Sequence, residues 1–439
     1  MELRGCKRRI EHVMFTERRD DIMITEASTS STPVFTLLDF PVPIIYDILS
    51  RLPLTDIFRC RCICKMLLKL LKDSYFSKIH FALASTLRTN LILRENFGRW
   101  DALHFFTFDL SESTLPSCSS IDGDQTIYCS TSSERNSEFT FRTNGLTLVG
   151  SCNGLFCFYS NPPSRPFYVI CNPILGECIR LPQIITPSML YNYENRLGFF
   201  GCCPRTKQYE IISFVDRTSA DYINSVYARK VIVHIHTLGS DSWRTIEDVP
   251  CPKRSPFDPL LNGSLHWITD SEKPSELITS FELGTEKFDF VAPPSHFNSL
   301  YMNKVSWINV GVLRGCLCLC YIYEDVLFDV WVMREYGVRQ SWTKEFGIDM
   351  KFYCQLRVED LHRPLRFFGN GDMCFVSSAG TLVSFSPKKR TFKELRLIGS
   401  RREVSLHNLS FISLKDIVGK KNPDLQILGI KSRELMFDL

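Results

Sequence analysis

The sequence lacks any long hydrophobic run. No stretch approaches the roughly 18 consecutive apolar residues that a membrane-spanning helix needs, and residues 1–21 are charged throughout, without the apolar core of a secretory signal. These absences predict a soluble intracellular protein of the nucleus or the cytoplasm, with no membrane partner. The formal net charge is only +4 and is dispersed along the chain, which argues against nucleic acid as a partner.

The 18 cysteines also lack the spacing of a metal site. No C-x-x-C pair occurs in the sequence, and that pair is the commonest signature of a structural zinc site. Disulfides are not expected in a protein without a secretory signal. The cysteines are therefore interpreted as reduced thiols that pack like small hydrophobic residues. Neither a metal nor any other cofactor is predicted.

Glycine is missing from residues 37–97, and the chain has two unlike parts. Residues 1–33 are polar and are predicted to be a disordered tail. Residues 34–97 carry apolar residues at helical spacing, which predicts a helical domain with a linker helix. From residue 98 onward, short runs rich in Val, Ile, Phe, Tyr and Trp alternate with Gly, Asn, Pro and Ser, which indicates an all-β region.

Two helices are expected in the helical domain. Pro43 suits a first helical turn, because its missing N–H costs nothing there, and Pro53 ends that helix. Thr55 is a suitable N-cap for a second helix that runs to about Lys72. Apolar residues cover more of this second helix than a surface helix needs, which predicts a protein partner. Its opposite face is basic and carries Arg61, Lys65, Lys69 and Lys72.

The run FPVPIIYDILSRLPLTDIFRCRCICKMLLKLLKDSYFSKIHF, residues 40–81, resembles the F-box of plant F-box proteins. Its fixed elements appear in order: Phe-Pro at 40–41, ILSRLP at 48–53, RCRCICK at 59–65, and then Phe76, Lys78 and His80. The resemblance implies that these helices insert apolar side chains into an acidic Skp-type adaptor and thereby join a cullin ligase. The residues expected to pack against the adaptor or the neighbouring F-box helix are Phe40, Pro41, Ile44, Ile48, Leu49, Leu52, Pro53, Ile57, Ile63 and Leu67.

Leu67 departs from the family pattern, which usually has Trp at this position. Leucine buries less area than tryptophan and makes no aromatic contact, so the departure predicts weaker adaptor binding. A helical cap on the β region that binds no adaptor is the alternative for this domain.

A turn followed by an apolar strand recurs in the β region. Its copies begin at Asn153-Gly154, Asn262-Gly263, Arg314-Gly315 and Asn370-Gly371. The glycines lie 109, 52 and 56 residues apart, so a degenerate copy is expected near residues 204–212. A second hairpin follows each turn, which gives four strands in a period of roughly 53 residues. That is the pattern of a propeller blade.

The repeat predicts a mainly β protein with a small α domain, in which a helical F-box is followed by a β-propeller of six or seven blades over residues 98–420. Five blades are expected over residues 145–398, and residues 103–141 supply a sixth. Residues 404–414 are expected to help close the ring, which removes exposed sheet edges. Residues 421–439 are expected to be a C-terminal extension. The four tryptophans at repeat positions are predicted to be blade core: Trp243, Trp267, Trp331 and Trp342.

The segment TLVGSCNGL, residues 147–155, resembles the opening of the F-box-associated interaction domain of plant F-box/kelch-type proteins. Asn172-Pro173 and Leu181-Pro182 downstream add to the likeness. It implies that the propeller captures a target protein for ubiquitination and degradation. A non-degradative scaffold or interaction module is the alternative. The proline-rich loop 250–257 joins two blades, and the candidate target-binding residues in it are Lys253, Arg254 and Phe257.

No catalytic residue is predicted. His234 and His236 lie on one face of an expected strand, but no third metal ligand lies at a telling distance. The segment 150–154, GSCNG, lacks the Gly-x-Ser-x-Gly spacing of a nucleophile elbow. A propeller-based hydrolase or oxidase is the enzymatic rival, and it requires a polar cluster in the central channel of the propeller.

Overall fold

The structure of the chain is a computed structural model. It describes residues 37–52, 54–87, 89–97, 100–108, 126–129, 139–142, 146–160, 167–184, 197–219, 228–247, 249–253, 256–271, 273–349, 363–367, 371–376, 382–397, 402–407, 410–419, 425–427 and 434–436. The predicted tail, residues 1–33, lies outside the described residues. The chain divides into two compact units, Met1–Ile45 and Tyr46–Leu439, and each is described by itself.

The first part of the chain is helical, as predicted. A short 3-10 helix is followed by four α-helices: η1 (Leu37–Asp39), α2 (Val42–Arg51), α3 (Leu54–Ile63), α4 (Lys65–Leu71) and α5 (Ser74–Leu87). Pro43 lies in the first turn of α2, as its missing N–H predicts. Asp73 caps α5, because its Oδ1 accepts a hydrogen bond from the Tyr75 N–H at 2.9 Å. Pro53, the predicted end of the first helix, lies outside the described residues.

The prediction of a single helix from Thr55 to about Lys72 is wrong. The backbone at Cys64 is extended, with φ −155° and ψ 162°, and the Cys64 sulfur accepts a hydrogen bond from the Leu67 N–H at 3.5 Å. The expected basic face is therefore divided, since Arg61 belongs to α3. The other three basic residues are exposed on α4 and at its C-cap: Lys65, Lys69 and Lys72. Cysteine is a poor helix former, and capping α4 satisfies a backbone donor that would otherwise be free.

The prediction that residues up to 97 are helical is also wrong. Residues Thr89–Phe97 form strand β1, which pairs antiparallel with β2 (Trp100–Phe108) and with β25 (Arg402–His407). The absence of glycine from residues 37–97 is compatible with a strand as well as with a helix, and Leu and Ile pack in both. Pairing with two neighbouring strands decides the conformation, which no local pattern reveals. The β region therefore begins at Thr89 instead of residue 98.

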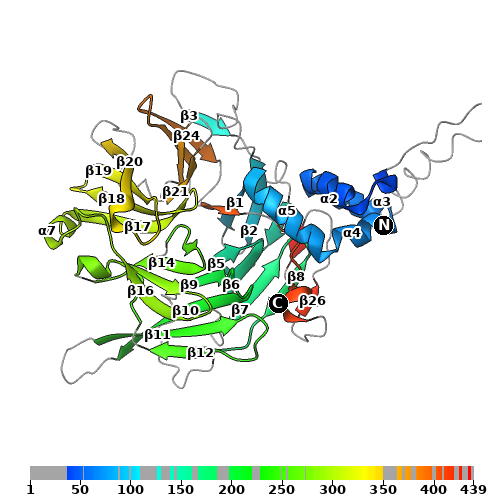
Figure 1. Ribbon diagram of the computed structural model, residues 1–439, viewed down its shortest axis with the longest axis horizontal. Helices are drawn as coiled ribbons and strands as arrows, with labels where there is room; N and C mark the ends of the chain where they lie inside the picture. The colour runs from blue at the N-terminus through cyan, green and yellow to red at the C-terminus, as the bar shows by residue number, and fades with distance from the viewer. Residues whose placement is uncertain are drawn as a thin grey trace, which may run out of the picture. The chain divides into compact units, whose positions relative to one another are not determined.

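The described residues of the β region form six sheets of four or five strands (Figure 1). Five of them contain four consecutive antiparallel strands, which is the construction of a propeller blade. The first three are β5 (Thr147–Cys152), β6 (Leu155–Ser160), β7 (Phe167–Asn172) and β8 (Glu177–Arg180); β9 (Leu197–Cys202), β10 (Tyr209–Ser219), β11 (Ala228–Thr237) and β12 (Arg244–Glu247); and β13 (Leu260–Leu261), β14 (Ser264–Ile268), β15 (Ile278–Glu282) and β16 (Lys287–Val291). The next two are β17 (Val305–Leu313), β18 (Cys316–Tyr323), β19 (Leu327–Met333) and β20 (Trp342–Asp349); and β21 (Arg363–Phe367), β22 (Met373–Val376), β23 (Leu382–Ser386) and β24 (Thr391–Leu397).

The sixth sheet is built from both ends of the β region. Its order is β25, β1, β2 and β4 (Phe139–Arg142), so a late strand pairs with the earliest one. This confirms that residues 103–141 contribute to a blade, and residues 404–407 of the predicted closing segment 404–414 help to close the ring. A sheet that joins early and late strands leaves no open edge between the first blade and the last.

Three short strands extend the sheets beyond the repeat. β3 (Thr126–Cys129) pairs parallel with β24, and the two lie side by side in Figure 1 although they are far apart in the sequence. β26 (Leu425–Ile427) pairs with β8, and β27 (Glu434–Met436) pairs parallel with β4. The prediction of residues 421–439 as an extension is therefore wrong, because they contribute β26 and β27 to two blades. An added strand covers backbone groups at the sheet edge.

The predicted turns have the left-handed backbone that tight hairpins require. Asn153 and Gly154 have φ values of 50° and 82°, and Asn262 and Gly263 have 51° and 82°. Positive φ at both central residues is the mark of a type I′ turn, which matches the twist of the flanking strands. Lys207, in the degenerate copy expected at residues 204–212, also has a positive φ, of 60°.

Alanine at Gly154 is expected to destabilise the protein by about 2 kcal/mol more than alanine at Gly315. Both glycines have positive φ, so both substitutions strain the backbone. Only at Gly154 would the new Cβ also meet other atoms, lying 2.1 Å from Ser410 Oγ and 2.6 Å from Ser410 N. Urea denaturation of the two variants measures the difference. Equal midpoints would show that the close approach of residue 410 is relieved at no cost.

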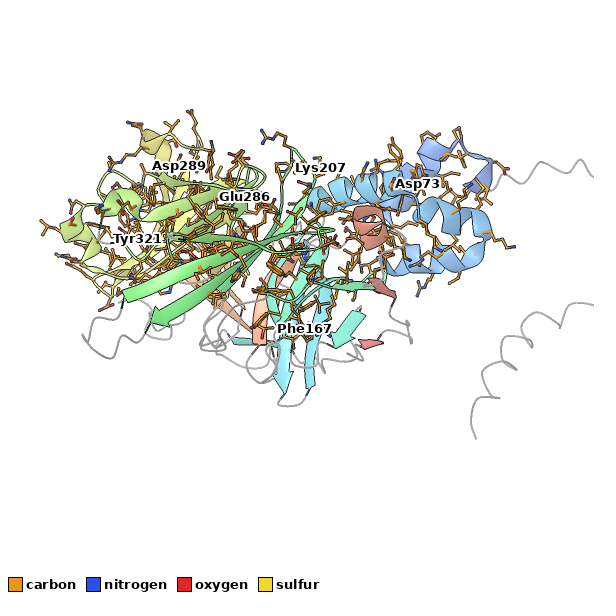
Figure 2. The ribbon with its side chains drawn as sticks, turned by 90° about the horizontal axis from the view of Figure 1, so that it is seen from below. Asp73, Phe167, Lys207, Glu286, Asp289 and Tyr321 are labelled. Carbon is orange, nitrogen blue, oxygen red and sulfur yellow. The ribbon has the colours of Figure 1, made fainter. Side chains whose placement is uncertain are left out.

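The cores lie between neighbouring sheets. One cluster joins β9–β12 to β13–β16 and is centred on Trp267, which is fully buried. Another joins β13–β16 to β17–β20 and includes the buried Tyr321, labelled in Figure 2. Trp342 is buried as predicted, whereas Trp243 and Trp331 are half-buried.

Acid is expected to destabilise the propeller through three buried histidines. Burial lowers the pKa of His407 to about 3 and the pKa of His266 to about 4, from an ordinary value of 6.5. Burial likewise lowers the pKa of His236 to about 4. Below pH 6.5 these histidines bind protons in the unfolded chain but stay neutral in the folded chain. The free energy of unfolding therefore falls as the pH drops from 6.5 toward 4. The slope is about 1.4 kcal/mol per pH unit for each histidine.

Urea midpoints at pH 7, 6 and 5 test this expectation. Replacing His407 by phenylalanine removes one titrating ring that lies against Phe156, with centroids 4.0 Å apart. The variant is expected to show a shallower pH slope than the wild type, whatever its stability at pH 7. An unchanged slope would mean that His407 is not protonated on unfolding in this range.

Candidate functional site

The helices of the second unit share a small apolar core. Its fully or almost fully buried members are Leu49, Ile57, Leu67, Leu71 and Phe76. The Tyr46 hydroxyl of α2 donates a hydrogen bond to Asp73 Oδ2 at 2.7 Å, so α2 is tied to the start of α5. Burial, followed by this hydrogen bond, raises the pKa of Tyr46 to about 12, so the phenol stays protonated.

Apolar side chains also remain exposed on the helical part. In the first unit these are Leu38, Phe40, Val42 and Ile44. In the second unit Ile63, the last residue of α3, is 69% exposed, and Met66 and Tyr75 are exposed as well. Isolated exposed apolar residues are common on proteins, but each unit carries several on few helical residues, which is more than a solvated helix surface needs.

The predicted adaptor-binding residues differ in burial, and one of them, Pro53, lies outside the described residues. The exposed group contains Phe40, Pro41, Ile44 and Ile63, while Ile48 and Leu52 are half-buried. The buried group contains Leu49, Ile57 and Leu67, whose side chains are at most 3% exposed. Their burial fits packing against a neighbouring helix, which is one of the two roles expected of them, and their contact with an adaptor stays a prediction. The sequence does not reveal which side chains of these short helices are buried, because the break at Cys64 changes how α3 and α4 are oriented.

The position of Leu67 changes the meaning of its departure from the F-box pattern. Its side chain is 3% exposed and lies in the core of the helices. Leucine in place of tryptophan therefore bears first on the packing of α4, and the weaker adaptor binding expected from it stays a prediction.

A segment near the end of the chain holds α5 against one blade. The Ser77 hydroxyl of α5 donates to the Phe411 carbonyl at 2.7 Å, and the Phe411 ring lies 5.5 Å from Phe76 and 5.0 Å from His80, centroid to centroid. On its other side, Asn172 of β7 donates to the Ile412 carbonyl at 2.7 Å. Residues 410–412, the clamp segment, therefore contact both a helix and a sheet of the second unit.

The short helix α8 (Leu414–Val418) anchors the clamp segment. The buried carboxylate of Glu177, on β8, accepts hydrogen bonds from the Leu414 N–H at 2.7 Å and from the Ser413 hydroxyl at 2.8 Å. The Lys415 ammonium lies 3.3 Å from the same carboxylate. A carboxylate at a helix N-terminus is favourable, and this one fixes the start of α8 to the blade.

The predicted target-binding loop is only partly available. Lys253 is exposed, with Nζ 4.0 Å from the Asp270 carboxylate, and Arg254 lies outside the described residues. Phe257 packs against the core cluster of the β17–β20 blade. A Cβ on Gly311 would lie 2.3 Å from its ring. Phe257 is therefore a partly buried packing residue, and its role in target binding stays a prediction.

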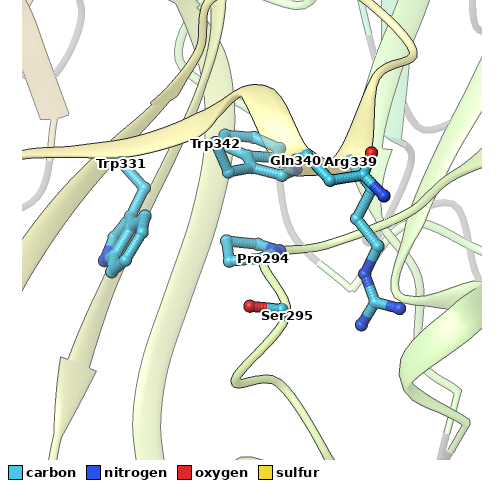
Figure 3. Close-up of a pocket in the computed structure, with 6 residues that line it drawn as sticks. All are labelled: Pro294, Ser295, Trp331, Arg339, Gln340 and Trp342. Carbon is cyan, nitrogen blue, oxygen red and sulfur yellow. The ribbon is translucent and has the colours of Figure 1, made fainter.

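A pocket lies where the chain leaves β16 and where it enters β20. It has a volume of about 330 Å³, and its lining residues are Pro294, Ser295, Trp331, Arg339, Gln340 and Trp342. Figure 3 shows Pro294 and Ser295 between Trp331 on one side and Arg339 on the other. The sequence singles out the two tryptophans, as blade core, but gives no signal for Arg339 or Gln340, because they belong to the turn η4 (Arg339–Ser341) between strands.

The β region matches a known family over most of its length. The F-box associated beta propeller domain matches residues 103–413, which is more than half of the chain. The chain belongs to this family. The F-box domain matches residues 37–79, which span η1 and the helices up to the first part of α5. The predicted order of a helical F-box followed by an F-box-associated propeller is confirmed.

Relatives of this F-box protein are found in Arabidopsis thaliana. F-box protein At3g07870 is 28% identical over 400 residues, which cover 83% of this chain and 88% of that protein. F-box protein CPR1 is 29% identical over 333 residues, which cover 70% and 72% of the two chains. F-box/kelch-repeat protein At3g23880 is 24% identical over 324 residues, which cover 72% of this chain and 81% of that protein, so the predicted kelch-type character has only loose support. Among solved structures, a six-bladed propeller lectin of Aleuria aurantia matches with a TM-score of 0.32 at 8% identity, covering 74% of this chain and 96% of that one.

The two histidines considered as metal ligands, His234 and His236, make contacts within the F-box protein itself. His234 Nδ1 lies 3.1 Å from Thr245 Oγ1, and His236 Nε2 lies 3.1 Å from the Ser240 carbonyl. Within the described ranges, no three His, Cys, Asp or Glu side chains are grouped as a metal site requires. Burial raises the pKa of the Cys157 thiol well above its ordinary value, so it does not act as a thiolate.

No helix in the described part of the chain is both long and apolar enough to cross a membrane.

Proposed function

We propose that the chain is a non-catalytic substrate-recognition subunit of a Skp–cullin–F-box ubiquitin ligase, acting in the nucleus or the cytoplasm. Its F-box docks a Skp-type adaptor through exposed apolar side chains, and its propeller holds a target protein for ubiquitination and degradation. The observation that supports docking most is Ile63, an apolar side chain left 69% exposed at the end of an F-box helix.

Charge supports the same assignment. Lys65, Lys69 and Lys72 are exposed on α4 and at its C-cap, close in sequence to Ile63 and Met66. Basic residues around an apolar patch attract an acidic adaptor and raise the association rate more than the affinity. The chain's contribution to the reaction is then to hold a target lysine near the conjugating enzyme, which is catalysis by proximity.

Co-expression with a Skp-type adaptor and its cullin tests the proposal. The full chain is expected to co-purify with both, and the half-life of a bound target is expected to lengthen when the proteasome is inhibited. A chain that purifies without adaptor would contradict docking. Adaptor binding with a target half-life that ignores proteasome inhibition would favour the alternative, a non-degradative scaffold.

A further inference from the structure

The pocket described above is lined by a cation, Arg339, that has no ion-pair partner among the residues that the structure describes. The Nε of Arg339 donates a hydrogen bond to the Pro293 carbonyl at 3.1 Å, which holds the side chain in the pocket lining. In the part of the chain that the structure describes, neither terminal nitrogen of this guanidinium has a hydrogen-bond or ion-pair partner. Both remain available as parallel donors, the geometry that matches a carboxylate.

Other basic residues of the same blade do have carboxylate partners. Arg334 forms an ion pair with Glu345, which also lies 3.7 Å from Arg314. Lys344 lies 2.7 Å from the Asp329 carboxylate. Arg339 therefore differs from its neighbours, and the six lining residues of the pocket include no acidic side chain that would neutralise it.

The apolar walls of the pocket are already in place. Trp342 is 6% exposed, and its Nε1 donates to the Ala292 carbonyl at 2.9 Å. Trp331 is backed by the His296 ring, with centroids 4.6 Å apart. Indole rings that are already fixed in place lose little conformational entropy when a ligand binds, so they favour binding more than mobile side chains would. A volume of about 330 Å³ lies at the small end of ligand pockets and suits one or two amino-acid side chains.

The surface beside the pocket indicates a ligand longer than the pocket itself. Val338 directly precedes Arg339 and is 41% exposed, whereas the hydroxyl of Tyr336, two residues earlier, lies 2.7 Å from His266 Nε2. An exposed apolar side chain next to the cationic residue of the pocket complements a peptide segment with both an acidic and an apolar residue. A lone small acid would leave Val338 uncovered.

We propose that this pocket receives an Asp or Glu side chain from an internal segment of the target protein, with Arg339 pairing its carboxylate. An apolar residue next to that acid covers Val338 and the edge of Trp331. The proposal deepens the proposed function and rests on it, because the acidic segment is taken to belong to the ligase target.

Affinity selection with a peptide library tests the pocket. The full chain, co-expressed with a Skp-type adaptor, is incubated with random hexapeptides that are acetylated and amidated, so that every carboxylate belongs to a side chain. The wild type is expected to enrich peptides with Asp or Glu next to an apolar residue by at least about tenfold. The variant Arg339→Glu is expected to reverse the preference toward Lys and Arg. The matched control Arg205→Glu, an exposed arginine on another blade, is expected to keep the wild-type preference.

Three results would overturn the assignment: no enrichment, an acidic preference that survives in Arg339→Glu, or binding only by peptides with a free C-terminal carboxylate. Adaptor co-purification is measured on the same preparations. Its loss in the wild type counts against the proposed function, whereas a failed selection with adaptor present counts against the pocket alone.

Discussion

Replacing Ile63 by aspartate is expected to abolish co-purification with a Skp-type adaptor. Ile63 is 69% exposed, so the substitution leaves the fold intact. In the docked complex the new carboxylate would be buried without a partner, which costs about 3 kcal/mol or more and raises the Kd by over a hundredfold. Ile44, exposed in the first unit, is expected to respond in the same way. Pull-down with purified adaptor over a concentration series measures the loss.

Leu300→Asp is the matched control for this experiment. Leu300 is 80% exposed on the short helix α7 (Ser299–Met302) of the propeller, outside the F-box. Its substitution introduces the same charge and is expected to leave adaptor binding unchanged. If Ile63→Asp binds the adaptor as well as Leu300→Asp does, Ile63 is not part of the docking surface. Leu49 is a poor site for such a test, because it is fully buried and aspartate there would unfold the helices.

Truncation of Phe411 is expected to have the second large effect. Phe411→Ala removes a 3% exposed ring from between Phe76, His80 and the clamp backbone, and buried Phe to Ala changes cost about 3–5 kcal/mol. The Phe411 ring joins α5 to residues that bind β7. In Phe411→Ala the hydrogen exchange of the α5 amides is therefore expected to accelerate, relative to the wild type, more than that of the blade amides.

Urea denaturation and amide hydrogen exchange measure the two parts of this expectation. Phe290→Ala removes the same side chain from a site that is 42% exposed, and it is expected to cost less than about 0.5 kcal/mol. Uniform acceleration of exchange in the blades and α5 would show that Phe411 stabilises the unit as a whole and does not act as a local clamp.

Features that depend on local chemistry could be predicted from the sequence. Asn153-Gly154 and Asn262-Gly263 predict tight hairpins, because few other residue pairs tolerate two positive φ angles. The structure has positive φ angles at both pairs. The spacing of these turns then predicts four strands per blade. The position of Pro43 in the first turn of α2 follows from its missing N–H in the same way.

Features that depend on distant pairing could not be predicted. Strand β1 owes its conformation to β2 and β25, and β26 and β27 are three-residue strands whose partners lie far earlier in the chain. The burial of Leu49 and Leu67 depends on how the helices meet after the break at Cys64. The sequence gives no signal for Arg339, because a lone arginine in a turn resembles any solvated residue until the pocket around it is known.

The pairing of β25 with β1 also sets an order for synthesis. While the ribosome is still making the later blades, β1 has no strand on one side, and the sheet it belongs to cannot be completed before Arg402–His407 has emerged. The F-box helices have by then long been available. A nascent chain of this protein therefore presents F-box helices whose α5 still lacks its contact with Phe411, together with an open ring, so the exposed strand edge must be protected from other chains until the last blade arrives.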